Sequence, residues 1–400
     1  MKRYLRLLLT LGGALCGLAL CQGMTACAEY GQSEDGLWNY NTYEDGTVSV
    51  SLIDKTAETA DVPEKVNGMT VTMVEVDCFN GCENLKTVTL PDTITVIEDY
   101  SFYNCAALES ISIPRNVKNI GFQAFYGCTS LEELRIPAGT DDIEAFAFEG
   151  CNSLKGIYVS DGNHAYKDED GILFDYDGTT LILYPSANPS ESYTVPEECT
   201  EIYDYAFIGN SYLKSVDISG ITKLGEDAFY YCTALESMDI PESITELNGS
   251  VFGNCTALQS IGLPSSLQTI GNGCFYSCMN LTEIEIPETV TSIGEYAFFN
   301  CPLLKEIRLT KNTTSIGAYA LGFYYSNTEQ LEHVPGFTVD AMDDTAAFTY
   351  CVENSIRCTG GITQGSVFIY IIVGVIVLVI LAVIGLIIMQ KKIQKRYELP

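Results

Sequence analysis

Cysteine is the residue type that most invites a chemical role in this chain of 400 residues. The sequence holds 16 cysteines, and eight of them form two series of four with a spacing of 23 residues: Cys82, Cys105, Cys128 and Cys151, then Cys232, Cys255, Cys278 and Cys301. Zinc sites need Cys or His ligands paired at short spacing. The chain has no C-x-x-C pair and only two histidines, His164 and His333, far apart. The series therefore favours buried, reduced thiols over a metal site.

Acidic residues give a second candidate site. Asp168, Asp170, Asp175 and Asp177 lie close together in the sequence, where they suggest calcium ligands. An EF-hand needs a Glu at the twelfth position of its loop, and Ser186 stands there when Asp175 is the first. Ordinary Asp-Gly turns explain the cluster. Neither histidine has a carboxylate at helical spacing, and no Ser/His/Asp set is apparent, so we expect no enzyme, no metal site and no cofactor.

Two cysteines near the carboxyl end lie outside the repeating series. Cys351 and Cys358 are near enough in sequence for a disulfide that would tie down the last part of the folded domain. An oxidising compartment would permit that bond. We predict a candidate disulfide here, with two free thiols as the alternative.

Phenylalanine sets the register of the whole chain. It recurs every 22 or 23 residues in two arrays, at Phe79, Phe102, Phe125 and Phe148 and then at Phe207, Phe229, Phe252, Phe275 and Phe298. The third residue after each Phe is Cys (Asn210 is the exception), the sixth is Leu, and the ninth and eleventh are aliphatic. That last alternation predicts a short strand with one buried face, often ended by Pro.

A single repeat cannot bury its own Phe, Leu and Ile, whereas stacked repeats share one continuous core. Equivalent strands would then pair in parallel at about 4.8 Å per repeat. We therefore predict a β-rich solenoid of about ten coils of 23 residues with a hairpin insertion, followed by one transmembrane helix near the carboxyl end.

The repeat closely resembles that of the BspA-like, or Treponema-type, leucine-rich repeat family. The resemblance rests on units such as Ile293-Gly294-Glu295-Tyr296-Ala297-Phe298, followed by Cys301 and Leu304, and it covers about residues 48–360. It implies a surface protein, bacterial or from some protists, that binds host components or other cells. It transfers no catalytic residues.

The predicted strands have one outward residue between their two aliphatic positions, and these residues would form a row across the sheet. We take this row as the candidate interaction face: Thr89, Ser112, Arg135, Tyr158, Asp217, Asp239, Glu285 and Arg308. Solenoids use such extended surfaces for protein ligands. Plain solvent exposure would give the same mixture of charges.

The predicted organisation follows from the repeat and its interruptions. We assign 1–28 to a signal peptide, 37–72 to an amino-terminal cap, 73–160 to the first array, 161–196 to the β-hairpin insertion, 197–322 to the second array, 323–360 to a carboxyl-terminal cap and stalk, 367–389 to a transmembrane helix and 390–400 to a cytoplasmic tail. Two apolar runs around an Asp-Gly turn predict the hairpin. It would either project a binding tip or join the two arrays.

Both ends of the chain carry export and membrane signals. A basic start, an apolar run over 7–20 and an Ala26-Cys27-Ala28 cleavage site indicate a secretory signal, with lipidation of Cys27 as the alternative. Residues 367–389 are uncharged and basic residues follow them, which predicts one membrane span with a cytoplasmic carboxyl end. The expected localisation is the cell membrane, single-pass, with the amino-terminal domain extracellular.

The net charge of −31 excludes a nucleic-acid partner, because phosphate binding depends on clustered Lys and Arg. It suits cationic partners. We expect a non-enzymatic surface protein that mediates protein–protein interaction or adhesion, with an unknown protein or glycan ligand outside the cell. The alternative is a structural envelope component without a dedicated ligand.

Overall fold

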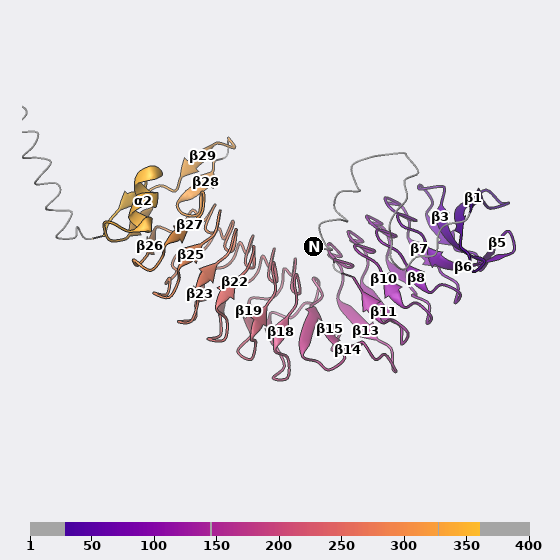
Figure 1. Cartoon of the computed structure of the whole chain (residues 1–400). Helices are drawn as coiled ribbons and strands as arrows, with labels where there is room; N and C mark the ends of the chain where they lie inside the picture. Colours follow the sequence, from indigo (N-terminus) through magenta and orange to yellow (C-terminus); the bar gives the residue numbers. More distant parts are fainter. Residues whose placement is uncertain (1–28, 145, 327, 361–400) are drawn as a thin grey trace, which may run out of the picture.

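The computed structural model describes residues 29–360, except 145 and 327. These residues form a row of coils that curves into an arc, each coil being one complete turn of a solenoid (Figure 1). Two ladders of short strands and one face of turns enclose the core. Each coil buries its apolar side chains against its neighbours, as the repeat spacing requires.

The first ladder contains the strands with the alternating pattern, whose central residue is buried in most coils. Its members are β4 (Thr59–Asp61), β7 (Thr87–Thr89), β9 (Ser110–Ile111), β11 (Glu133–Ile136), β13 (Gly156–Val159), β17 (Ser192–Thr194), β19 (Ser215–Asp217), β21 (Ser237–Asp239), β23 (Ser260–Gly262), β26 (Glu306–Arg308), β30 (Thr338–Asp340) and β31 (Arg357–Cys358). Neighbouring strands pair in parallel and in register within four separate sheets, as Arg135 does with Tyr158.

The second ladder lies on another side of each coil and consists mostly of two-residue strands. It runs through β6 (Met69–Val74), β8 (Val96–Ile97), β10 (Asn119–Ile120), β12 (Asp142–Ile143), β16 (Thr180–Leu183), β18 (Glu201–Ile202), β20 (Lys223–Leu224), β22 (Glu246–Leu247), β24 (Thr269–Ile270), β25 (Ser292–Ile293) and β27 (Ser315–Ile316). The second residue of most of these short strands is buried, and the pairing is again parallel.

The third side of each coil is the turn face, the segment from the second-ladder strand to the repeating Cys, for example 98–104 and 294–300. Its backbone bonds to the next coil, as Phe102 N does to Ala124 O at 2.7 Å. The repeating Phe points inward from this segment. The rings stack from coil to coil: Phe102 and Phe125 lie 5.0 Å apart with an interplanar angle of 2°.

Two end structures cover the row. At the amino end, β1 (Glu29–Gln32), β2 (Trp38–Thr42) and β3 (Thr47–Leu52) are antiparallel; β3 then joins β6 in parallel, and β5 (Lys65–Val66) pairs with β6. At the other end, β28 (Phe323–Tyr325) and β29 (Leu331–His333) form a hairpin. Helix α2 (Ala346–Glu353) follows, begun by Thr345, whose side chain accepts a hydrogen bond from Phe348 N.

The segment between the arrays is part of the core. β14 (Tyr166–Glu169) pairs antiparallel with β15 (Ile172–Asp175), and β15 pairs antiparallel with β16. β16 then joins the second ladder. Adjacent residues of β15 serve two hydrophobic cores: Leu173 packs with the residues before it, and Phe174 packs with those after it. Successive side chains of a strand point to opposite faces, which makes this possible.

The predicted fold class is wrong in two respects. The solenoid has about 13 coils, more than the predicted ten, because residues other than Phe build several of them. Tyr184 is one, since its buried ring stacks on Phe207 at 5.0 Å.

The second error concerns the membrane. Among the described residues no helix is long and apolar enough to cross a bilayer, and α2 has eight residues. The predicted span, 367–389, the tail, 390–400, and the signal, 1–28, lie outside the described residues. The predicted transmembrane helix and single-pass membrane localisation are therefore not retained.

Candidate binding surfaces

The predicted interaction face lies along the first ladder. Seven of its eight residues are exposed and Tyr158 is half-buried, since the aliphatic residues on either side of each take the inward positions. Register brings Arg135 beside Tyr158, with its guanidinium 5.8 Å from the ring centroid. Ser112 and Glu285 lie outside the strands. β17 adds Thr194 to the row, in register with Asp217.

Four cations on or beside the first ladder are paired with acids of the adjacent coil. Lys86 contacts Glu58 at 2.8 Å, and Lys155 contacts Glu132 at 2.9 Å. Lys214 with Glu191 and Arg308 with Asp340 repeat the arrangement. All are exposed, so each pair contributes little to stability. The charges of these four cations are compensated, whereas Arg135 lies against the Tyr158 ring and Lys305 donates to the Pro302 and Pro335 carbonyls.

The Asp residues of β14 and β15 accept hydrogen bonds from nearby backbone N–H groups and so have a local structural role. Asp168 Oδ1 accepts a hydrogen bond from Val159 N at 2.7 Å, and Asp175 accepts from Thr180 N at 3.0 Å. In the described part of the chain, no group of three or more His, Cys, Asp or Glu residues is arranged to hold a metal ion.

The repeating cysteines are free and buried. From the second coil onward each thiol donates to the main-chain carbonyl of the Phe one coil earlier, for example Cys128 Sγ to Phe102 O at 3.2 Å. Burial raises the pKa of the Cys151 and Cys301 thiols to about 12. Buried, protonated thiols of this kind are inert structural groups.

The two cysteines of the candidate disulfide are also free in the structure, and they lie side by side. Cys351 is buried in α2, and Cys358 is half-buried in β31. Burial and the neighbouring Cys358 thiol raise the pKa of Cys351 to about 12. Cys358 Sγ donates to Ala341 O at 3.3 Å.

Aromatic residues gather on the turn face, which sequence reasoning missed. Most of them stand two residues before the repeating Phe or one residue after it, and all are partly or fully accessible except Phe299: Tyr100, Tyr103, Phe122, Tyr126, Phe146, Tyr205, Tyr230, Tyr231, Tyr276, Tyr296, Phe299 and Tyr319. Rings of adjacent coils stack, as Tyr103 does on Tyr126 at 4.7 Å. The signal was present as a second aromatic register beside the Phe.

The backbone conformation of the turn face is unfavourable for several of these aromatic residues. The residue two before the repeating Phe has a positive φ in coil after coil, and at Tyr100 and Tyr296 the angles are 59° and 56°. Glycine, asparagine and aspartate suit this left-handed conformation, whereas a bulky side chain there is strained. Strain of this kind concentrates at functional sites.

One hollow of about 420 Å³ lies on the turn face of the second array. Five aromatic residues line it, Tyr230, Tyr276, Tyr296, Tyr325 and Phe299, and Ser250, Asn272, Gly273 and Glu295 complete the lining. It exists because two neighbouring coils carry small residues where others carry rings. Gly253 takes the position of Tyr276, and the Tyr230 ring leans over it, 2.8 Å from where a Cβ would stand.

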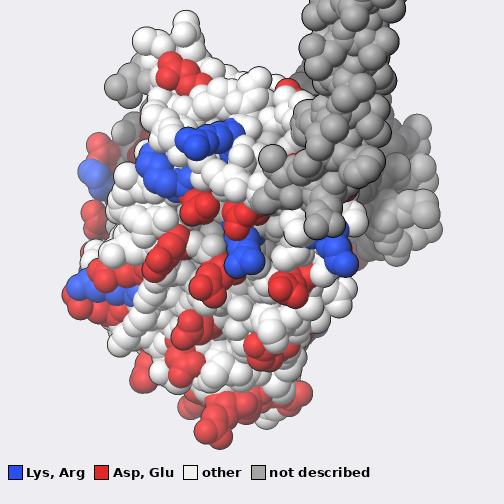
Figure 2. All heavy atoms as spheres, turned by 90° about the vertical axis from the view of Figure 1, so that its left-hand side faces the viewer, with Lys and Arg blue, Asp and Glu red and all other residues white. Residues whose placement is uncertain are grey.

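Charge around the carboxyl-terminal end of the row is mainly negative. Figure 2 shows this end with acidic side chains spread over most of it and basic ones gathered in its upper part. The lining of the turn-face hollow has one carboxylate, Glu295, and neither lysine nor arginine. A cation meets no like charge there.

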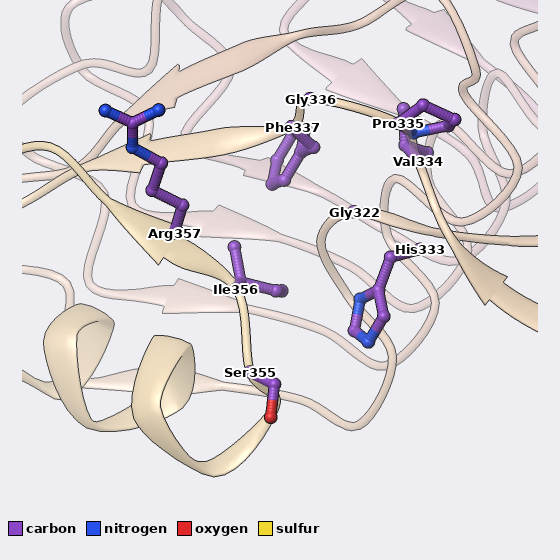
Figure 3. A pocket seen from close by; sticks show the side chains of 9 residues that line it. All are labelled: Gly322, His333, Val334, Pro335, Gly336, Phe337, Ser355, Ile356 and Arg357. Carbon is purple, nitrogen blue, oxygen red and sulfur yellow. The ribbon is translucent and has the colours of Figure 1, made fainter.

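A second, smaller hollow of about 320 Å³ lies between the β28–β29 hairpin and β31 (Figure 3). The side chains of Phe337, Ile356 and His333 surround it, while Arg357 extends away from His333. The His333 ring contacts Phe323 at 4.7 Å. Neither Ser355 nor His333 forms a side-chain hydrogen bond within the described residues, so no nucleophile–base pair is present there.

The stacked strands, the internal Phe ladder and the geometry that repeats from coil to coil define a leucine-rich-repeat β-solenoid. The model of the BspA type leucine rich repeat region matches six copies, at residues 63–169, 185–255 and 222–355, which is more than half of the chain. The chain belongs to this family, and the resemblance drawn from the sequence is confirmed. Among curated proteins no match was found.

The chain is similar to several solved structures. The pneumococcal vaccine antigen PcpA is 21% identical with a TM-score of 0.53, over 84% of this chain and 99% of that one. A leucine rich cell surface protein from Faecalibacterium prausnitzii is 24% identical, with a TM-score of 0.43 over 76% and 97% of the two chains. A leucine-rich repeat protein from Bacteroides ovatus is 22% identical, with a TM-score of 0.41 over 81% and 98%. The first likeness shows a shared fold.

Proposed function

We propose that the chain is a non-enzymatic interaction protein that mediates adhesion by binding a protein or glycan ligand of a host, a matrix or a neighbouring cell. The observation that carries the proposal is the row of mostly accessible aromatic residues on the turn face, several of which have a positive φ. A merely structural coil would place glycine or asparagine at Tyr100 and Tyr296, because both residues have a positive φ. Tyrosine is also the residue type that interfaces favour most, together with tryptophan and arginine.

The first ladder supports the same proposal more weakly. Its exposed residues, from Thr89 to Arg308, form an extended row suited to a protein ligand. Three of its lysines, Lys86, Lys155 and Lys214, are already paired with acids of the adjacent coil. A ligand there would have to displace those acids, so we assign it the secondary role.

Saturable binding of the full chain to immobilised matrix proteins, mucin and whole cells tests the proposal. Replacement of Tyr103 and Tyr126 by serine, in the stacked pair of the first array, together with Tyr296 by asparagine, should lower binding. Replacement of Thr89 and Ser112 by alanine is the matched control on the first ladder. Absence of saturable binding to every member of the panel would contradict adhesion.

The alternative is a structural envelope component without a dedicated ligand. The compensated ion pairs along the first ladder favour it, because a spacer needs a surface that attracts nothing. Deletion of the protein would then change envelope integrity and leave attachment unchanged.

A further inference from the structure

We propose that the turn-face hollow between Tyr230 and Tyr325 binds the side chain of a basic residue, arginine foremost, on a protein partner. This inference rests on the proposed interaction function and names the chemistry of the ligand. It follows from the shape, the charge and the unengaged polar groups of the hollow.

The shape fits a single side chain and its adjoining backbone. At about 420 Å³ the hollow is near the lower end of ligand pockets, which span roughly 300–1,000 Å³. Tyr276 stacks on Phe299 at 5.6 Å, and Tyr325 meets Phe299 edge-on at 5.0 Å. Phe299 is fully buried, so it supports the rings above it and fixes their positions.

Its chemistry favours a cation. The faces of tyrosine rings attract guanidinium and ammonium groups, and arginine also stacks on them. Glu295 is exposed at the hollow, and its carboxylate forms no hydrogen bond or ion pair within the described residues. The net charge of −31 would draw basic partners toward this surface and repel acidic ones.

Further polar groups are unengaged. Asn272 Oδ1 accepts a hydrogen bond from Glu295 N at 2.8 Å, which holds the amide in place and leaves its NH₂ group without a partner among the described residues. The Ser250 hydroxyl is likewise unengaged there. These groups can bond the main chain of a bound segment. A neutral sugar could use them too, but it would gain nothing from Glu295 or from the net charge.

Tyr296 allows folding to be separated from binding. Its φ of 56° is a conformation that asparagine adopts more readily than tyrosine. The substitution Tyr296→Asn should therefore leave the fold at least as stable while removing one wall of the hollow. Gln123→Asn is the matched control, since Gln123 occupies the same repeat position in the first array with a φ of 51° and is not part of the aromatic row.

The test is the affinity of the full chain for a labelled peptide of alternating arginine and glycine, with the citrulline counterpart as the uncharged probe. At about 0.15 M salt, where long-range attraction is screened, Tyr296→Asn and Glu295→Gln should each weaken arginine-peptide binding about tenfold. Gln123→Asn and Glu283→Gln should stay within about twofold of the parent chain. Glu283 is exposed and lies between Tyr276 and Tyr296 in the sequence, so it controls for the loss of one charge.

Three results would overturn the inference. An equal loss of arginine-peptide affinity in all four variants would indicate attraction by the whole chain. The other two are binding of the citrulline peptide as tightly as the arginine peptide, and displacement of the arginine peptide by a neutral oligosaccharide. The adhesion panel separates the two proposals. If Tyr296→Asn and Glu295→Gln leave panel binding unchanged while it remains saturable, the adhesion proposal stands and this inference fails. If the peptide result holds but no panel member binds, adhesion fails and the cation site stands.

Discussion

The Cys255 thiol donates a hydrogen bond to the main-chain carbonyl of Phe229, one coil earlier, with an Sγ···O distance of 3.1 Å. The same contact joins Cys301 to Phe275. It explains why cysteine recurs at this position: a small apolar residue fits the core, and its S–H gives a buried carbonyl a second hydrogen bond beside the one from the backbone N–H three residues on. At the exception, Asn210 Nδ2 donates to Pro185 O at 3.2 Å.

Cys255→Ala should therefore destabilise the solenoid by about 0.5–1.5 kcal/mol, because it removes one of the two hydrogen bonds that the buried Phe229 carbonyl accepts, the other coming from Cys232 N. Cys255→Ser keeps a donor and should cost less. The urea midpoint of the full chain measures both, with exposed Ser237→Ala as control. Equal loss in the alanine and serine variants would show that packing, and not the hydrogen bond, selects cysteine.

Thiol accessibility should divide the cysteines into two classes. The repeating thiols are buried and their pKa values are raised, so they should resist a disulfide reagent at pH 8 in the native chain. Cys358, half-buried in β31, should react first. Mass spectrometry of labelled peptides assigns the sites. Rapid labelling of Cys128 or Cys255 without denaturant would contradict the closed core.

Much of the solenoid could be predicted because its core repeats in the sequence. The Phe register and the alternating aliphatic pair suffice to place the buried faces. Tyr184 also lies in that register, 23 residues before Phe207, and the search for Phe alone passed over it. Its hydroxyl made it a poor core candidate by type, yet the ring stacks in the ladder all the same.

The turn-face hollow was harder to predict. The tyrosines are visible in the sequence, but nothing local says that their segment lies outside the core or that it adopts a positive φ. The hollow depends on small side chains as much as on large ones, since Ser250 and Gly273 line it at the repeat position that Tyr296 fills one coil later. Such a site is a property of several coils together, and no single repeat contains it.

Oxidation should join Cys351 to Cys358, because the two thiols are neighbours in the folded end structure. Oxidised glutathione would accept the two electrons and two protons, giving two glutathione molecules and one protein disulfide. Peptide mapping should find the cross-link in the native chain at mild oxidant concentrations. Formation of mixed disulfides on Cys358 alone would show that α2 and β31 hold the sulfurs in an unsuitable geometry.

Glu98 should make stability fall as pH rises. Burial, together with Asp99, Glu75 and Glu144, raises the pKa of Glu98 to about 7. A carboxyl group whose folded pKa is raised carries no penalty below its unfolded pKa, about 4.3, where both states are protonated. Above that pH the unfolded state ionises first, so stability is lost progressively until about pH 7 and then levels.

Glu98→Gln should remove this loss. Its urea midpoint should match that of the parent chain near pH 4 and exceed it at pH 8, and the difference should develop between those limits. Glu109→Gln removes one exposed charge of the same array and serves as control. A constant difference at every pH would assign the effect of Glu98→Gln to packing.

β15 should act as the joint between the two cores, because Leu173 is buried in one and Phe174 in the other. Leu173→Ala should cost about 2–5 kcal/mol and Phe174→Ala about 3–5 kcal/mol. Stability in a repeat array depends on each unit and its immediate neighbours. Hydrogen exchange should then show faster opening of β11 and β13 for Leu173→Ala, and of β18 and β20 for Phe174→Ala. If either substitution speeds exchange uniformly along the arc, the two cores unfold as one unit and β15 is an ordinary strand of a single cooperative solenoid.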